Sequence, residues 1–236
     1  MFPLILLPGL ACDEQLWQHQ LPVLAARHAG PVKVADVHQR AASLPEMAAL
    51  LLAEHEGPLL LAGCSMGGMV ALEAARQAPQ RVRGLAILGS TARADTPASQ
   101  RLRAQGIAQF ESGQAEPLLR ANALFAFARP HQARLTPAYL AMLLRAGTPA
   151  LIRQNRAVMA RDDLRPHLGA ISCPTLVVGG QDDTLTPPDC AREIAQAITG
   201  AQLHLLPQCG HMLTWEQPEA VNTLLLAWLS QITPAP

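Results

Sequence analysis

The chain has 236 residues, half of them apolar, which is enough for one substantial domain with a continuous core or for one domain with an insertion. Charged residues make up 15% and balance to zero, so the composition provides no overall basic field to attract nucleic acid or an anionic membrane. The first ten residues lack a basic segment and break at Pro8-Gly9, which argues against a signal peptide, and no stretch approaches the about 20 apolar residues of a membrane helix. We therefore expect a cytoplasmic protein without a nucleic-acid or membrane partner.

Six short apolar runs are bounded by turn residues and are predicted to be strands: residues 4–7, 32–36, 59–63, 85–89, 175–180 and 203–207. They are almost continuously apolar, as strands covered on both faces are. Helices are predicted between them over residues 14–28, 44–55, 66–77, 188–198 and 217–230. Asp13 and Ser43 can cap the first two helices, and Pro79 follows the third. The alternation predicts an α/β fold with a mainly parallel open sheet of about six strands and helices on both faces.

The alternation stops between residues 93 and 168, where only helical segments interrupted by prolines are predicted. An insertion after the fourth strand would lie at the carboxyl ends of the strands, where open α/β sheets bind their ligands. We expect an α/β core of residues 1–92 and 169–236 and a helical lid of residues 93–168.

A short motif, Gly63-Cys64-Ser65-Met66-Gly67, lies between the third predicted strand and the helix that follows it. Gly-x-Ser-x-Gly in this context predicts a nucleophile elbow, a sharp turn that holds a serine in a strained conformation at a helix N-terminus. The glycines allow the strand and the helix to approach closely. The structural alternative is an ordinary glycine-rich turn.

A serine hydroxyl becomes nucleophilic when a histidine, itself oriented by a carboxylate, accepts its proton. In this architecture the chain order is serine, acid, histidine. The acidic pair Asp182-Asp183 follows the fifth predicted strand, and His211 lies in the loop after the sixth. Both positions are at the carboxyl ends of strands, as Ser65 is.

These motifs resemble the α/β-hydrolase-fold superfamily over nearly the whole chain, most specifically in "LLPGLACDEQLW", "LAGCSMGGMVALE", "CPTLVVGGQDDTLTPP" and "GHMLTWEQPEAV". The family's Gly-x-x-Asp-x-x-x-Pro pattern fits Gly180, Asp183 and Pro187, so the resemblance implies that Asp183 is the acid and Asp182 a turn residue. The family's Gly-His followed by Glu-x-Pro is matched at His211 and Glu216.

The resemblance also implies an oxyanion hole made of two backbone N–H groups, those of Leu10 and Met66. Two departures from the family pattern stand out. The oxyanion loop reads Pro8-Gly9-Leu10 and lacks the common His-Gly start, and two strands that usually precede the first one here are missing. We therefore expect a shortened sheet and an oxyanion loop whose orientation has no obvious support.

Other residues that could take part in chemistry have simpler interpretations. Asp36 and Asp95 also end strands, but Asp36 precedes Ser65 in the chain, and Asp95 is a second choice for the acid. The five cysteines are widely scattered and show no CxxC pair, so they predict free thiols and no metal site. Cys64, beside the serine, is expected to be a buried apolar residue.

The arginines of the insertion, Arg145, Arg153 and Arg156, could bind an acidic group of a substrate, although a solvated helix face is the simpler interpretation. Histidines outside the motif have no assigned role; His38 ends the second strand, and His131 and His167 lie in the insertion.

The sequence predicts a serine hydrolase for a small-molecule substrate, an ester, thioester or lactone of a small to medium, mainly apolar acyl compound, with no cofactor. Four alternatives stay open on the same scaffold: a carbon–carbon hydrolase, a cofactor-free haloperoxidase, a lyase and a ligand-binding protein without activity. The sequence leaves the oligomeric state open.

Overall fold

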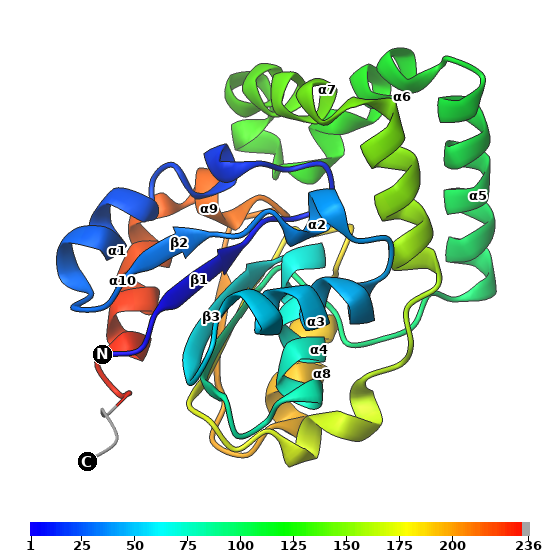
Figure 1. Cartoon of the computed structure of the whole chain (residues 1–236). Helices are drawn as coiled ribbons and strands as arrows, with labels where there is room; N and C mark the ends of the chain where they lie inside the picture. Colours follow the sequence, from blue (N-terminus) through cyan, green and yellow to red (C-terminus); the bar gives the residue numbers. More distant parts are fainter. Residues whose placement is uncertain (233–236) are drawn as a thin grey trace.

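A computed structural model describes residues 1–232 and contains one sheet of six parallel strands (Figure 1). The strands are β1 (Leu4–Leu7), β2 (Val32–Val34), β3 (Leu59–Cys64), β4 (Val82–Leu88), β5 (Thr175–Gly180) and β6 (Gln202–Leu206). Their order in the sheet is β2-β1-β3-β4-β5-β6, so the chain starts next to one edge, adds β2 at that edge and then adds β3 to β6 in the other direction. The prediction of a six-stranded parallel α/β sheet is confirmed.

Two strands differ from their predicted bounds by two residues or more. β2 ends at Val34 because the chain turns at Asp36 into a short helix, α2 (Val37–Arg40), which the sequence analysis did not predict. β4 begins at Val82, three residues earlier than predicted, since Val82 already pairs with Leu59 of β3. It ends before Gly89, whose φ of 50° takes the chain out of the strand.

Helices cover both faces of the sheet. On one side lie α3 (Leu44–Glu54), α4 (Met66–Gln77) and α8 (Pro188–Ala197), and on the other α1 (Leu21–Arg27) and α10 (Pro218–Leu229) (Figure 1). Alternate residues of β1 point to opposite sides: Leu4 and Leu6 pack in one hydrophobic cluster, and Ile5 and Leu7 in the other. Burial of both faces explains why the strands are continuously apolar.

One predicted helix is divided into two, and proline lies in the first turn of two of the helices. The segment predicted as one helix over 14–28 forms a 3₁₀ helix, η1 (Glu14–Trp17), and then α1, in whose first turn Pro22 lies. The last helix likewise begins at Pro218 and is preceded by the short α9 (Leu213–Glu216). Proline favours the first turn of a helix because it has no N–H to donate and its φ is already helical.

The predicted caps form as expected. The Asp13 side chain accepts a hydrogen bond from the Gln15 N–H, and the Ser43 hydroxyl accepts one from the Glu46 N–H. The α4 helix ends at Gln77, two residues before Pro79.

The insertion, which is the segment of residues 93–168, is helical and projects from the carboxyl ends of the strands (Figure 1). It contains α5 (Pro97–Glu111), α6 (Ala115–Asn122), the 3₁₀ helix η2 (Ala123–Ala126) and α7 (Arg129–Met159). A further 3₁₀ helix, η3 (Arg165–Ala170), leads back to β5.

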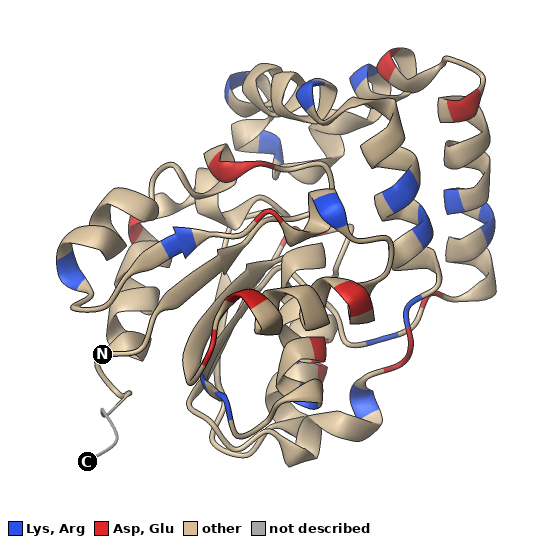
Figure 2. Cartoon of the chain, in the orientation of Figure 1, with Lys and Arg blue, Asp and Glu red and all other residues tan. Residues whose placement is uncertain are grey.

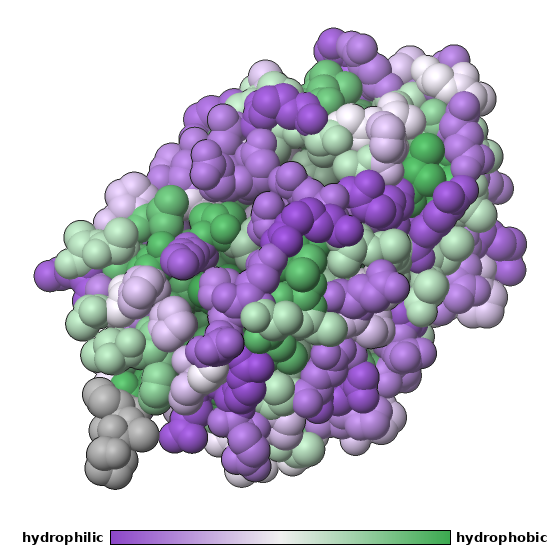
Figure 3. Space-filling model, viewed as in Figure 1, coloured by the Kyte–Doolittle hydropathy of each residue, from purple (hydrophilic) through white to green (hydrophobic). Residues whose placement is uncertain are grey.

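Within residues 1–232, α7 alone is long and apolar enough for its length and composition to suit a membrane span. Gly147, at φ 78°, breaks it into two helices, each shorter than the about 20 residues of a straight span. On the face drawn in Figure 3, the hydrophobic residues of the described chain form separate patches between hydrophilic ones. We take α7 to be the central helix of the insertion.

Candidate active site

Ser65 is the residue at which β3 turns into α4, and its backbone is strained. Its φ of 54° and ψ of −119° lie outside the regions that residues with a side chain normally adopt. The two glycines of the motif are required by space: a Cβ on Gly63 would lie 2.2 Å from the Gly67 oxygen, and one on Gly67 would lie 2.1 Å from the Leu7 oxygen. The motif therefore forms a strand-turn-helix elbow that presents the serine.

Neighbouring segments hold this turn in place. The Ser65 N–H donates to the Leu88 carbonyl at 2.9 Å, at the end of β4. The Ser65 carbonyl accepts from the Ser90 hydroxyl at 2.7 Å and from the Gly68 N–H at 2.9 Å. Because both backbone polar groups are bonded, the strained conformation is fixed by the surrounding structure.

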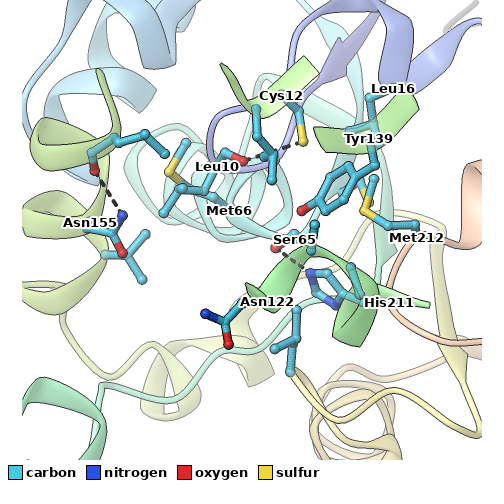
Figure 4. Close-up of a pocket in the computed structure, with 18 of the residues that line it drawn as sticks. Leu10, Cys12, Leu16, Ser65, Met66, Asn122, Tyr139, Asn155, His211 and Met212 are labelled. Carbon is cyan, nitrogen blue, oxygen red and sulfur yellow. Dashed lines mark hydrogen bonds between the residues drawn. The ribbon is translucent and has the colours of Figure 1, made fainter. Parts of the chain in front are cut away.

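His211 bridges Ser65 and Asp183 through its two ring nitrogens (Figure 4). Its Nε2 lies 2.8 Å from the Ser65 Oγ, and its Nδ1 lies 2.8 Å from the Asp183 Oδ2. The carboxylate accepts at Oδ2, so Nδ1 carries the proton, and Nε2 is left to accept from the serine hydroxyl. The three residues form a triad-like arrangement, although 118 and 28 residues separate them in sequence.

Asp183 is buried and bonded by the turn that follows it. Its Oδ1 accepts from the N–H groups of Leu185 and Thr186 at 2.8 and 2.9 Å, and its Oδ2 accepts from the Thr186 hydroxyl at 2.7 Å. Burial opposes the charged form, but the electrostatic interaction and hydrogen bond with His211, together with the Thr186 bonds, outweigh it and lower the pKa of Asp183 below its ordinary value. The group is therefore an ionised carboxylate at neutral pH. Sequence reasoning missed the supporting role of Thr186.

The other candidate acids lie elsewhere. Asp182 is exposed and its N–H donates to the Cys209 carbonyl, so it occupies the turn. Asp36 pairs with Arg40 at the surface. Asp95 is buried between Arg103 and Arg161, both at 2.7 Å, and serves as a structural ion pair.

The loop that carries His211 is fastened by a buried carboxylate, Glu216. Its Oε2 accepts from the N–H groups of Gly210 and Ala128, each at 2.9 Å, and its Oε1 accepts from the Met212 N–H at 3.1 Å. Burial raises the pKa of Glu216, against the effect of these bonds. The Glu-x-Pro pattern drew attention to this residue in the sequence, but its contact with Ala128 of the insertion had no sequence signal.

The two predicted oxyanion donors, Leu10 and Met66, lie beside Ser65 (Figure 4). Met66 is the first residue of α4, and Leu10 lies in the loop after β1. This loop lies against the elbow, since a Cβ on Gly9 would be 3.3 Å from the Ser65 Cβ. Within residues 1–232, the N–H groups of Leu10 and Met66 have no recorded acceptor. Two free donors beside a nucleophile can stabilise an oxyanion.

A cavity of about 360 Å³ opens above Ser65 and His211 (Figure 4). The core contributes the reacting groups to its wall, and the insertion contributes mainly apolar side chains. The insertion residues are Arg103, Phe110, Leu119, Asn122, Ala123, Ala126, Tyr139, Leu143, Leu151, Asn155 and Val158. This volume is within the range of small-molecule sites, and the lining suits an apolar group.

The cysteines near the site are poor nucleophiles. Burial raises the pKa of the Cys64 thiol to about 12 and raises the pKa of Cys12 and Cys209 well above the usual value. All three remain protonated at neutral pH. Within residues 1–232, no group of three or more His, Cys, Asp or Glu side chains gathers as a metal site.

The three arginines left open by the sequence, and the histidines His38 and His131, have structural partners. Arg145 binds Asp13 at 2.7 Å, Arg156 binds Glu111 at 2.6 Å, and Arg153 donates to the Gln39 carbonyl. His131 contacts the Gln208 carbonyl, and His38 contacts the Cys12 carbonyl beside the oxyanion loop.

Comparisons with known proteins agree with this fold. A family model described as "alpha/beta hydrolase fold" matches residues 41–218. A pimeloyl-[acyl-carrier protein] methyl ester esterase of Nitrosomonas europaea is 31% identical, over 75% of this chain and 73% of the relative. A candidate carbamate hydrolase of Serratia proteamaculans is 28% identical, over 96% of this chain and 90% of the relative. The solved structure of a thermophilic esterase from Thermogutta terrifontis has a TM-score of 0.87 and 25% identity, with coverage of 99% of this chain and 91% of that one.

Proposed function

The chain belongs to the α/β hydrolase fold family of enzymes, and from this premise we propose that it is a serine hydrolase that cleaves a carboxylic ester, thioester or lactone of a small to medium, mainly apolar acyl compound. One observation carries the proposal: the hydrogen bonds from Asp183 through His211 to the Ser65 hydroxyl, at the floor of an apolar cavity.

Acylation begins when the Ser65 Oγ attacks the carbonyl carbon and its proton moves to His211 Nε2. The carbon–oxygen double bond becomes a single bond, and the carbonyl oxygen takes the negative charge. When this intermediate collapses, the bond to the leaving alcohol or thiol breaks, and the leaving group takes the proton from His211. The products of this half-reaction are the free leaving group and an acyl ester on Ser65.

Deacylation repeats these steps with water. His211 Nε2 accepts a proton from a water molecule as that water attacks the acyl carbon, and the proton then passes to the Ser65 oxygen as the bond to the acyl group breaks. The carboxylic acid leaves and the free serine is restored.

Two supporting roles follow from the geometry. Asp183 accepts from His211 Nδ1–H, which fixes the ring tautomer and stabilises the imidazolium that forms in each half-reaction. The N–H groups of Leu10 and Met66 donate to the developing oxyanion; one such donor is typically worth about 3–4 kcal/mol of transition-state stabilisation.

We further propose that the insertion is a lid that selects the acyl group. Phe110, Leu119, Tyr139 and Leu143 line the cavity, and their apolar surface favours a hydrocarbon chain over a charged one. An oxygen ester is the preferred bond because the names of two proteins similar to this one, from Nitrosomonas europaea and Thermogutta terrifontis, describe esterases.

The first test is reaction with a fluorophosphonate probe, followed by identification of the modified residue by mass spectrometry. We expect stoichiometric modification of Ser65 in the wild type and none in Ser65→Ala or His211→Ala. Ser230→Ala, which changes a serine at the C-terminus of α10, is the matched control and should react as the wild type does.

The second test is turnover of p-nitrophenyl esters, thioesters and lactones. Multiple turnovers that disappear in Ser65→Ala support the proposal. Cleavage of carbon–carbon substrates without ester turnover, or tight ligand binding without turnover, would replace it with one of the alternative functions of this scaffold.

A further inference from the structure

The oxyanion loop is held by a residue of the insertion. Ala11 follows the proposed donor Leu10 and adopts φ 55°, a conformation that residues with a Cβ rarely take. Its N–H, 1% exposed at the residue level, donates to the Gln154 Oε1 at 2.7 Å across 143 residues of sequence. Gln154 lies in α7, in the part after the break at Gly147.

The nitrogen of the Gln154 side-chain amide bonds to a third part of the chain, at His38. The Gln154 Nε2 donates to the His38 carbonyl at 3.0 Å, and His38 follows β2 in the short helix α2. The His38 ring returns to the loop, since its Nε2 lies 2.8 Å from the Cys12 carbonyl. A carbonyl only accepts, so Nε2 carries the proton.

These contacts form a closed ring of hydrogen bonds, which we name the loop clamp: Ala11 to Gln154, Gln154 to His38, and His38 to Cys12. Gln154 and His38 are 1% and 3% exposed, so water competes little for these bonds. Burial lowers the pKa of His38, which keeps the ring neutral at physiological pH. The clamp encloses the two residues that follow Leu10.

The clamp orients the oxyanion loop, for which the loop sequence itself shows no support. The loop has no His-Gly start to orient it, and its own internal contacts are the Cys12 N–H to the Gly9 carbonyl at 3.1 Å and the long Cys12 Sγ contact to the Leu10 carbonyl. Without an acceptor for its N–H, Ala11 would be free to relax toward an ordinary φ, which would rotate the backbone next to Leu10. The Leu10 N–H would then turn away from Ser65.

We propose that Gln154 and His38 are positioning residues that hold the Leu10 N–H toward the oxyanion formed at Ser65, so that a helix of the insertion supports transition-state stabilisation. The inference rests on the proposed function, because it concerns the oxyanion of that reaction. Neither side chain touches the substrate, and Gln154 and His38 do not line the cavity above Ser65.

The experiment compares Gln154→Met, Gln154→Glu and His38→Phe with the wild type and with Arg156→Gln, an exposed α7 position whose ion pair lies at the surface. We measure kcat and KM for p-nitrophenyl butyrate. We also measure the inhibition constants of a trifluoromethyl ketone, which becomes a tetrahedral oxyanion on the serine, and of the matched methyl ketone, which binds without that charge.

We expect kcat to fall about 10- to 100-fold in Gln154→Met with KM changed less than about 3-fold, because a misplaced oxyanion donor weakens only the transition state. The trifluoromethyl ketone should bind more weakly by a similar factor, and the methyl ketone should bind as before. Gln154→Glu keeps an acceptor for the Ala11 N–H and should recover part of the loss. His38→Phe should show the same pattern with a smaller effect.

The outcomes separate this inference from the proposed function. An active wild type whose Gln154→Met and His38→Phe variants keep kcat and trifluoromethyl ketone affinity within about 2-fold overturns the inference alone, as does a loss confined to KM. A wild type that turns over no ester removes the proposed function and the inference with it. If one clamp variant does not fold by circular dichroism, the other is judged by the same comparison.

Discussion

The core and the insertion contribute different things to one site. The core provides the proposed reacting groups, Ser65, Asp183 and His211, each at the carboxyl end of a strand. The insertion provides about half of the residues that line the cavity but no residue of that triad-like arrangement. They also differ in charge: eleven of the eighteen basic residues, but only five of the eighteen acidic ones, lie in residues 93–168. Figure 2 shows basic residues predominating on the helices of the insertion.

The different contributions of the core and the insertion to the site reflect how closely the backbone of each region is packed. In the core, backbone segments touch directly, and a Cβ on Gly180 would lie 2.1 Å from the Gly210 oxygen. Small displacements there would move His211 or Asp183. The insertion meets the cavity through side chains, which can change without moving the backbone. We propose that the core fixes the chemistry and the insertion sets the selectivity, while the loop clamp and Glu216 join the two.

The largest effect is expected within the core, from Asp183→Asn. The substituted amide cannot stabilise the His211 imidazolium and favours the wrong ring tautomer, so kcat for p-nitrophenyl butyrate should fall about 10⁴-fold. Asp182→Asn, a change at the neighbouring exposed residue, should leave kcat within about 2-fold. If both variants lose activity equally, the assignment of the acid is wrong.

Asp183→Asn should also change how the free energy of unfolding depends on pH. The pKa of Asp183 in the folded protein lies below its unfolded value of about 3.9, so its contribution to stability is complete above that value and is lost as the pH falls through the folded pKa. The raised pKa of Glu216 has the opposite sign, but it is common to both proteins and cancels in their difference. Urea unfolding of both proteins between pH 2 and pH 6 measures this difference, which should shrink toward acid; a constant difference would contradict it.

A smaller effect is expected at the junction of the two regions, from Glu216→Gln. The amide keeps one acceptor where three N–H groups are bonded and adds donors that face them, so the free energy of unfolding should fall by about 2–3 kcal/mol. We expect kcat to fall about 10-fold as the His211 loop loosens. Urea unfolding and ester kinetics measure both. Glu219→Gln, on the exposed first turn of α10, should lose about 0.5 kcal/mol at most.

In the insertion, the expected change is in selectivity. Leu143→Trp should fill part of the cavity and lower kcat/KM for p-nitrophenyl octanoate about 10-fold, while the acetate ester changes less than about 3-fold. Leu102→Trp, at an exposed position of α5, is the control and should change neither value. Equal loss on both esters would mean that Leu143 supports the chemistry rather than the choice of acyl group.

The smallest effect is expected at the surface of the insertion. Arg120 and Glu116 form an ion pair with both side chains more than half exposed. Arg120→Gln should therefore change the free energy of unfolding by less than about 0.5 kcal/mol and leave kcat unchanged. A larger change in either measurement would show that this surface is coupled to the cavity.

Much of the molecule is determined by local sequence patterns. The runs of apolar residues predicted all six strands, because a strand covered on both faces has no polar side. The motif around Ser65 predicted an elbow, because the glycines that permit it are within two residues of the serine. The positions of Asp183 and His211 after strands predicted that these residues would lie at the same edge as Ser65, since parallel strands end together.

Only the tertiary structure decided how this edge is supported. Gln154 meets Ala11 across 143 residues, and Glu216 meets Ala128 across 88, and neither pair has a periodic pattern or a motif. The sequence around a single polar side chain in a helix does not indicate which backbone group that side chain will bond, because the packing of other elements brings the two together. The sequence by itself therefore determined the fold and pointed to Ser65, Asp183 and His211, whereas packing decided what orients the oxyanion loop and the histidine.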